Sequence, residues 1–464
     1  MATAILGAGL FVFTAHLLEA VFEKTRIPDI LLLMVLGLLI GPVLGLLQPE
    51  DFGQVGNFLS VLTLLVILFE SGLSLRIKAL LESAGRAAPF SIISMLLAIA
   101  GLAGATHLML GLDPMMSLLG GFIMGGTSSA VVIPMLKALK AGEETMTVLM
   151  LESTVTDVFC IIGTVGIATS LAAGEGLAAT GLLGGATFSL LVASGMGVLF
   201  GGIWAVLHGR IARLEDNLFT TLAFAMLVYG LAETLQISGA IAALCFGITL
   251  GNLPKGLVLT VGRGTEGDSV ELTVGEVSME ERKVYAETVF LLKAAFFFYL
   301  GMQVHPSSFF SINGLAALAL AAVPFLPRYP VVRLGLDKAT TTRREALLAT
   351  MLVPRGLAAA VLAQIPVALD LPGGEMLAET VAMMVFLSIT LVSATVFLVE
   401  RGVLDIAGAV LFGPFAKEGP RSTENAVTPS EPDQAKPVVA GAPEQAGPAS
   451  GASAVEDDES ANDA

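Results

Sequence analysis

Long apolar runs separated by short polar loops make up most of the chain. A window of about 19 residues, close to the length that an α-helix needs to cross a bilayer, resolves thirteen such runs. They lie near residues 2–22, 27–48, 58–75, 87–111, 115–136, 146–173, 178–208, 216–234, 237–252, 285–304, 311–332, 345–370 and 377–400. The pattern predicts an all-α polytopic membrane protein with about 13 transmembrane helices in one domain, residues 1–403.

Basic residues are distributed unevenly between the loops. The loops that follow odd-numbered runs hold Lys and Arg, from Lys24 and Arg26 to Arg401 and Lys417, whereas the loops that follow even-numbered runs hold none. Because Lys and Arg are retained on the cytoplasmic side, this asymmetry predicts an external amino terminus and a cytoplasmic carboxyl terminus.

An odd number of crossings permits an internal symmetry. Six runs that start outside, one crossing, and six runs that start inside form a 6+1+6 inverted arrangement, with one repeat at about residues 1–173 and the other at about 214–403. Transporters built on inverted repeats bind their substrate near the membrane midplane, where broken helices cross. We expect this architecture here.

The composition excludes a soluble enzyme, because 55% of the residues are hydrophobic, only 14% are charged, and the mean hydropathy is +0.84. Half of the net charge of −16 lies in residues 418–464, which hold ten acidic and two basic residues. This stretch is rich in Pro, Ala, Gly and Ser, and we expect a disordered acidic cytoplasmic tail.

A second hydrophilic stretch, the cytoplasmic insert at residues 253–284, contains LVLTV and SVELTV around a GRGTEGD turn. It is either a short β-hairpin or a disordered loop. Two cysteines inside apolar runs and four scattered histidines support no zinc or redox site, and no phosphate-binding Gly-rich motif is present. We therefore expect no cofactor and no nucleic-acid partner.

Few ionisable residues lie deep in the apolar runs, where charge is costly and indicates a function. The deep positions are Glu70, Glu152, Asp157, Lys293 and Arg355. Four others lie nearer the ends of runs, where long side chains can reach the interface, namely Glu19, Glu233, Arg328 and Glu400.

The sixth run, MLESTVTDVF, carries two carboxylates with different surroundings. Glu152 and Asp157 are about 140° apart on a helix, whereas Ser153 and Asp157 share a face that Thr156 adjoins. Oxygen ligands suit a hard monovalent cation, and Asp157 is the expected ligand of that cation. Burial disfavours the charged form of a carboxylate, so one aspartate can hold either a proton or a cation. That competition is the chemistry of ion exchange.

The fifth run, GGFIMGGTSSAVVIPML, is easily interrupted because glycine pairs precede Thr127 and Ser128 and a proline follows. An interrupted helix offers backbone carbonyls and hydroxyls to a cation. The alternative is that its small residues only allow close helix packing. The neighbouring sixth run favours an ion site.

The remaining deep charges need partners. Arg355 cannot lose its charge, and we expect a structural ion pair with Glu152, which leaves Asp157 free to titrate. Lys293 either extends to the interface or pairs with an acid such as Glu70. Glu70 itself is expected to be structural first.

At these residues the chain resembles the monovalent cation:proton antiporter superfamily, closest to the NhaP-like sodium/proton antiporters and their sodium/hydrogen exchanger relatives. The likeness covers most of residues 1–403. The stretches TRIPDILLLMVLGLLIGP and LFESGLSL are similar to two family signatures. The family's E-S-x-x-N-D and R-G motifs correspond to Glu152, Ser153, Thr156, Asp157, Arg355 and Gly356.

This resemblance implies a homodimer in the cell membrane that exchanges a cation for H⁺ by an elevator-like movement. It implies that Asp157 carries the ion and the proton, with Thr127 and Ser153 as further ligands. The single titratable aspartate opposite an arginine resembles the electroneutral branch. The resemblance favours Na⁺ as the cation that Asp157 binds. Thr-Ser-Ser stands where many relatives have Thr-Asp-Pro and is similar to the potassium-efflux branch, so Li⁺ and a K⁺/H⁺ antiporter are the alternatives.

Two alternative functions belong to other classes, an ion channel and an intramembrane enzyme. An ion channel would need a repeated pore-filter element. An intramembrane enzyme would need a Ser/His or paired-Asp constellation or a histidine-rich metal site. The sequence contains neither pattern.

Overall fold

The computed structural model describes residues 2–25, 27–75, 77–139, 141–174, 185–210, 219–235, 237–253, 258–261, 270–273 and 279–416. The expected disordered tail at residues 418–464 and most of the insert at residues 253–284 lie outside the described residues.

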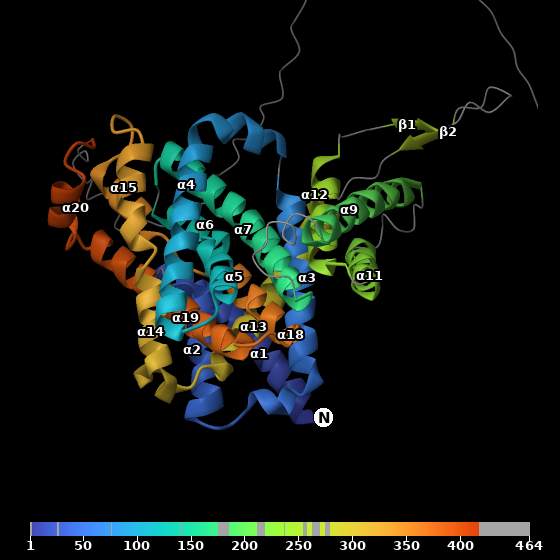
Figure 1. The fold of residues 1–464 in the computed structure, drawn as a ribbon, viewed down its shortest axis with the longest axis horizontal. Helices are drawn as coiled ribbons and strands as arrows, with labels where there is room; N and C mark the ends of the chain where they lie inside the picture. The colour runs from blue at the N-terminus through green and yellow to red at the C-terminus, as the bar shows by residue number, and fades with distance from the viewer. Residues whose placement is uncertain are drawn as a thin grey trace, which may run out of the picture. The chain divides into compact units, whose positions relative to one another are not determined.

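Helices dominate the described chain (Figure 1). They are α1 (Ala2–Thr25), α2 (Asp29–Leu38), α3 (Gln54–Ser74), α4 (Ile77–Leu110), α5 (Pro114–Gly125), α6 (Ser129–Ala138), α7 (Glu143–Ala172), α9 (Gly185–Arg210), α11 (Thr220–Thr234), α12 (Gly239–Asn252), α13 (Met279–Gln303), α14 (Ile312–Ala322), α15 (Phe325–Gly335), α16 (Arg343–Met351), α17 (Leu357–Leu362), α18 (Gln364–Ala368), α19 (Gly374–Glu400) and α20 (Asp405–Leu411). A π-helical turn, Leu39–Val43, extends α2, and short 3₁₀ turns occupy Pro49–Phe52 and Pro306–Phe310.

Among the residues that the structure describes, seven helical stretches are long and apolar enough to cross a bilayer. They are Ile5–Phe22, Pro89–Leu110, Glu144–Ala172, Leu191–His208, Val284–Gln303, Ile312–Gly335 and Gly374–Glu400. Six shorter apolar stretches accompany them, Asp29–Val43, Val61–Ser74, Pro114–Gly125, Thr220–Thr234, Gly239–Asn252 and Leu357–Ala368. The prediction of a helical multi-pass membrane protein is confirmed.

The insert contains the hairpin that was one of its two predicted forms. Strand β1 (Val258–Val261) pairs antiparallel with β2 (Val270–Thr273), in a register that places Val258 opposite Thr273. Val and Thr, which favour strands, make up most of both segments. Figure 1 shows both strands beyond the ends of α9 and α12.

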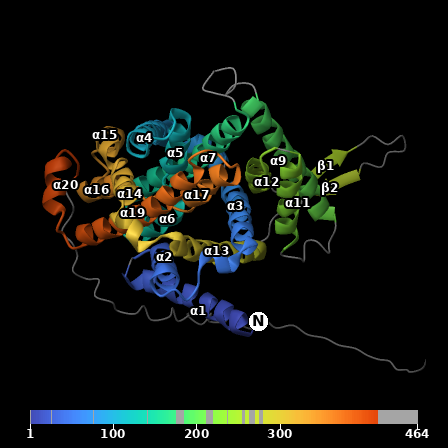
Figure 2. The same ribbon diagram turned by 60° about the horizontal axis from the view of Figure 1, so that its bottom comes forward.

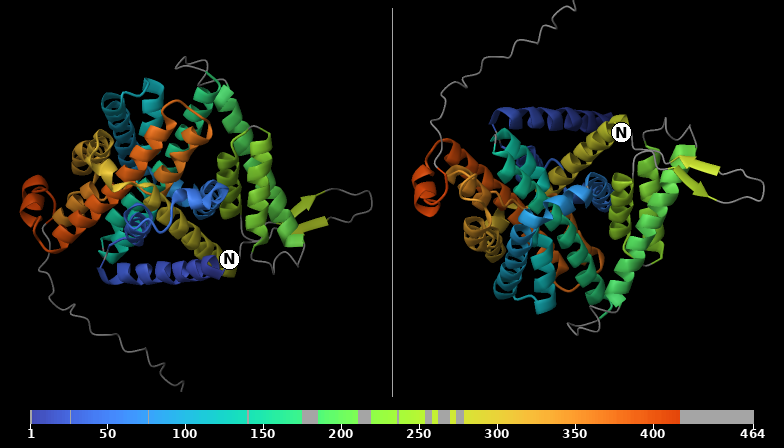
Figure 3. Two further views of the ribbon diagram at one scale, coloured as in Figure 1. Left: turned by 90° about the horizontal axis from the view of Figure 1, so that it is seen from below. Right: turned by 90° about the horizontal axis from the view of Figure 1, so that it is seen from above.

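Two groups of helices surround the site. Helices α9, α11 and α12 pack side by side, and α3 joins them through α12 (Figure 2). Their interface contains aromatic rings, including stacked Trp204 and Phe224 with centroids 4.5 Å apart. The second group packs α4 against α5 and α7, and α14 against α19 (Figure 3). The two interrupted helices described below belong to this second group.

Candidate ion-binding site

Two apolar stretches are interrupted by unwound backbone. The first break, residues 126–128, separates α5 from α6 and consists of Gly, Thr and Ser, which are poor helix formers. The second break, residues 352–356, separates α16 from α17. Pro354 lies within it and provides no amide hydrogen, and it disfavours helical backbone at the residue before it.

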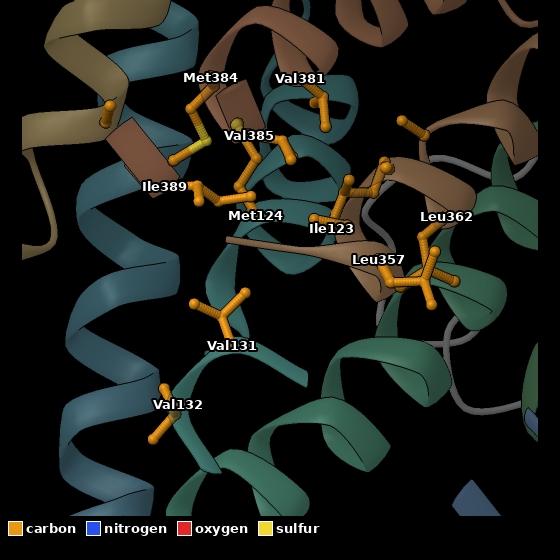
Figure 4. Close-up of a cluster of buried hydrophobic side chains, with 14 of the residues drawn as sticks. Ile123, Met124, Val131, Val132, Leu357, Leu362, Val381, Met384, Val385 and Ile389 are labelled. Atoms are coloured by element: carbon orange, nitrogen blue, oxygen red, sulfur yellow. The ribbon is translucent and has the colours of Figure 1, made fainter. Parts of the chain in front are cut away.

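The two breaks contact each other directly. The backbone amide of Ser128 donates to the carbonyl of Pro354 at 2.9 Å. Gly356 lies so close to the Ser128 side chain that an added Cβ would overlap the serine hydroxyl. Figure 4 shows the apolar side chains that surround this crossing, among them Ile123, Val131 and Leu357. Glycine at position 356 is therefore required by the close approach.

Arg355 neutralises the carbonyl end of α5. Its side chain is buried, with 1% exposure. One guanidinium nitrogen, Nη1, donates to the carbonyl of Gly125 at 3.0 Å and to the carbonyl of Gly126. Its backbone amide donates to Ser388 Oγ at 3.0 Å. The last carbonyls of a helix have no partner within it and carry partial negative charge, so a buried cation here is stabilised.

The predicted ion pair between Glu152 and Arg355 is wrong in its partner. Glu152 is bound by both terminal nitrogens of Arg328, with Nη2 at 2.6 Å from Oε2. Arg355 and Glu152 line the same gap of about 10 Å³, but Arg355 donates its hydrogen bonds to α5 instead. Arg328 lies seven residues before the end of the apolar stretch Ile312–Gly335, so it is inside that stretch and not at its edge.

Arg328 connects four helices through its guanidinium group. Besides Glu152 on α7, its Nε donates to Ala349 O on α16 at 2.9 Å, and its Nη1 donates to Ser94 Oγ on α4 at 2.7 Å. The group also lies 4.9 Å from the ring centre of Phe90. The expectation that Arg328 extends to the interface is therefore wrong, since its side chain is buried.

Asp157 forms no salt bridge within the described part of the chain. Its Oδ2 accepts a hydrogen bond from Ser129 Oγ, at the start of α6, at 3.0 Å. Gly126 leaves room beside it, because a Cβ there would lie 3.4 Å from Asp157 Oδ1. Asp157 is therefore a partly buried carboxylate with a hydroxyl donor at the crossing of the broken helices.

The predicted hydroxyl ligands have three different surroundings. Ser128 lines a cavity of about 380 Å³ together with Asp157, Ser129 and Gly126. Thr127 and Thr156 line the small gap instead, where Thr156 Oγ1 accepts from the amide of Thr127 at 3.2 Å. The Ser153 hydroxyl donates to Met150 O at 3.0 Å and lines neither cavity. No hydrogen bond joins Ser153 to Asp157 among the described residues, although both lie on α7.

Glu70 and Lys293 line the same cavity as Asp157, from α3 and α13. Lys293 Nζ lies 3.3 Å from Asp29 Oδ2 at the start of α2, and Glu70 accepts from Ser74 Oγ at 3.1 Å. Lys293 therefore pairs with Asp29 and not with Glu70, which was the predicted partner.

The ends of α7 and α16 that lie far from the crossing are joined by one carboxylate. Glu345 accepts hydrogen bonds from the amide of Gly142, which caps α7, and from the amide and hydroxyl of Thr342, which caps α16, at 2.8 and 2.9 Å. A negative group at two helix N-termini satisfies their free amides.

Three residues of the site were missing from the residues predicted from sequence. Ser129 follows the predicted Ser128 in the Thr-Ser-Ser run, but the sequence does not indicate that it is the residue bonded to Asp157. Asp29 is the first residue of α2, and nothing in the local sequence indicates that it pairs with Lys293. The apolar stretch that continues beyond Arg328 was the available signal that this arginine is deep.

Comparison with known proteins identifies the family and the fold. Residues 9–400 match the family described as the transmembrane sodium/hydrogen exchanger, and the chain belongs to this family. It is similar to Na(+)/H(+) antiporter 1 of Methanocaldococcus jannaschii, with 28% identity over 34% of this chain and 37% of that protein. It is also similar to the K(+)/H(+) antiporter NhaP2 of Shewanella oneidensis, with 25% identity over 86% of this chain and 66% of that protein.

A third relative is the ammonium/H(+) antiporter subunit AmhT of Alkalihalophilus pseudofirmus, with 25% identity over 54% of this chain and 63% of that protein. The chain thus matches about a third to two thirds of the length of these relatives. Among solved structures, the sodium proton antiporter MjNhaP1 of M. jannaschii at pH 8 superposes with a TM-score of 0.63 at 21% identity, covering 85% of this chain and 99% of that one. This likeness establishes the shared fold.

Proposed function

We propose that the protein is a secondary antiporter that exchanges a monovalent cation for H⁺ by alternating access, with Na⁺ as the favoured cation. The observation that carries this proposal is the position of Asp157. It lines a cavity at the crossing of two broken helices, while the neighbouring Glu152 is already paired with Arg328.

The chemistry follows from this difference between the two carboxylates. A carboxylate with a permanent counter-ion has no reason to bind a second cation, whereas an unpaired one in a partly buried site is stabilised by a proton or by a metal cation. Both ligands neutralise the same charge, so binding of one expels the other. Asp157 is the carrier, and Ser129 and Ser128 supply oxygen ligands from the break, with Thr127 supplying backbone oxygen.

The charge of the cavity favours cations. Lys293 is neutralised by Asp29, while Glu70 and Asp157 add negative charge to a wall that is otherwise largely apolar. A narrow cavity with one sign of charge concentrates ions of the opposite sign. Glu70 therefore raises the local cation concentration on the path to Asp157, and it does not carry the ion.

The transmembrane architecture is part of the same proposal. Thirteen crossings in a 6+1+6 inverted arrangement place one break in each repeat, and the loop asymmetry places the carboxyl terminus in the cytoplasm of a cell-membrane protein. We propose a homodimer whose broken-helix group, held together by Arg328 and Glu345, moves as one body during transport.

Potassium is the second candidate cation. The S. oneidensis relative is named a K(+)/H(+) antiporter and aligns over most of this chain. This chain also has serine at position 128, where many NhaP-like proteins have a second acid. With a single unpaired aspartate, exchange of either ion is one for one and electroneutral.

The test uses purified protein in liposomes with an imposed pH gradient and an internal pH dye. NaCl, LiCl, KCl, NH₄Cl or choline chloride is added to separate samples. Collapse of the gradient by an alkali cation, unchanged when the membrane potential is clamped by valinomycin and K⁺, is the expected result. No response to any alkali cation between pH 5 and 9 would contradict the proposal.

A further inference from the structure

A second charged pocket lies far from the ion site, between the start of α16, the end of α19 and α20. Its volume is about 180 Å³, and its lining includes Arg343, Arg344, Leu347 and Asp405. The first three share one face of α16, whereas Glu345 lies on the opposite face, where it binds Gly142.

Both arginines have unused donors in this pocket. The Nε atoms of Arg343 and Arg344 are buried and have no hydrogen-bond partner among the described residues. Arg343 Nη2 donates to Gly413 O at 2.7 Å, which fixes that side chain, but no hydrogen bond or ion pair joins Arg344 to the described chain. A buried donor without a partner costs roughly 1–3 kcal/mol, and the guanidinium of Arg344, a partly exposed residue of the pocket lining, can turn toward a ligand.

The neighbouring helix α20 has the pattern of a helix that lies in a membrane surface. Val403, Ile406 and Val410 are 60, 78 and 76% exposed on one side. Gly408 and Phe412 are buried against the protein on the other side. Exposed aliphatic residues at this spacing beside a basic pocket are typical of a helix whose apolar face enters the lipid boundary.

We propose that this pocket binds the phosphate group of an anionic phospholipid. Guanidinium groups match phosphate oxygens with paired hydrogen bonds, and basic pockets between transmembrane helices bind anionic head groups. The lipid chains would then lie along the exposed residues of α20. In the proposed topology this face is cytoplasmic, where anionic lipids are attracted to basic residues.

The negative charge of Asp405 should repel an anionic ligand in the pocket. A variant without this charge should bind the lipid more strongly, a gain that misfolding cannot produce. The lining holds two positive charges and one negative charge. Removing a positive charge should weaken lipid binding, and removing the negative charge should strengthen it. The experiment measures lipids retained by the purified full-length protein in native mass spectrometry, in detergent containing equal amounts of phosphatidylglycerol and phosphatidylcholine with identical acyl chains.

Arg344→Gln should lower the ratio of bound phosphatidylglycerol to phosphatidylcholine about five-fold, the factor expected for one arginine near an anionic surface. Asp405→Asn should raise that ratio. Lys338→Gln removes an exposed charge from the preceding loop, outside the pocket, and should leave the ratio unchanged.

Three results would overturn the proposal. The first is equal retention of the two lipids by the parent protein, and the second is an unchanged ratio in both Arg344→Gln and Asp405→Asn. The third is displacement of the bound phosphatidylglycerol by millimolar inorganic phosphate, which would identify the pocket as a site for free anions.

Discussion

Glu152→Gln should destabilise the protein strongly, because Arg328 would keep its buried charge without a counter-ion. In the structure Arg328 donates four hydrogen bonds, two of them to Glu152. After the substitution the bonds to Ser94 and Ala349 remain, but both are to neutral oxygens. Breaking a buried ion pair in this way costs about 3–5 kcal/mol.

A double-mutant cycle separates the observed pair from the pair predicted from sequence. The double variant Glu152→Gln with Arg328→Gln removes both charges, so its loss of stability should be smaller than the sum of the single losses by roughly 2–3 kcal/mol, the upper range for contacting residues. The cycle of Glu152→Gln with Arg355→Gln should give a clearly smaller coupling, because these side chains line the same gap but share no hydrogen bond.

The free energy of unfolding is measured by titrating the protein in mixed micelles with a denaturing detergent, and the far-ultraviolet circular dichroism reports the transition. Both cycles contain Glu152→Gln and the loss of one arginine. A difference between their couplings therefore does not come from a general effect of removing charge on stability. A larger coupling for Arg355 than for Arg328 would refute this assignment of the buried ion pair.

Three further predictions concern the site. Ser129→Ala removes a hydroxyl that contacts Asp157 and that we propose as a cation ligand. Loss of a ligand worth about 1.5 kcal/mol should raise the KM for the cation about ten-fold in liposome transport assays, and an unchanged KM would exclude the hydroxyl as a ligand. Gly356→Ala forces the two breaks apart and should abolish transport. The control Gly166→Ala should transport normally, because a Cβ at that position meets nothing within 4 Å. Similar transport rates for both variants would contradict the tight crossing. Glu345→Ala removes the shared cap of two helices and should lower stability by about 1–2 kcal/mol, which thermal unfolding would reveal, and an unchanged midpoint would count against the double cap.

Local sequence was sufficient to predict the helical stretches and the break between α5 and α6. Apolar length determines whether a helix can cross a bilayer, and Gly-Thr-Ser interrupts a helix wherever it occurs. The prediction of Asp157 as the unpaired carboxylate rests on its residue type and depth, which are also local properties.

The pairing of distant charges could not be predicted in the same way. Residues Glu152 and Arg328 are 176 positions apart, and nothing in either neighbourhood specifies the other. The choice between Arg328 and Arg355 depends on tertiary packing. Arg355 is drawn to the carbonyl end of α5, an acceptor that exists only once the helix is broken. Ser153 stays a prediction as an ion ligand, and in the structure its hydroxyl donates to a carbonyl of its own helix.

The central claim is that Asp157 holds either a proton or a cation, and counting protons tests it most directly. Titration calorimetry of the purified protein with the transported cation, in two buffers of different ionisation enthalpy, measures the protons released per cation bound. The account predicts one proton per cation for the parent and for Glu70→Gln, and no cation-linked release for Asp157→Asn. Proton release that persists in Asp157→Asn, or disappears in Glu70→Gln alone, would contradict it.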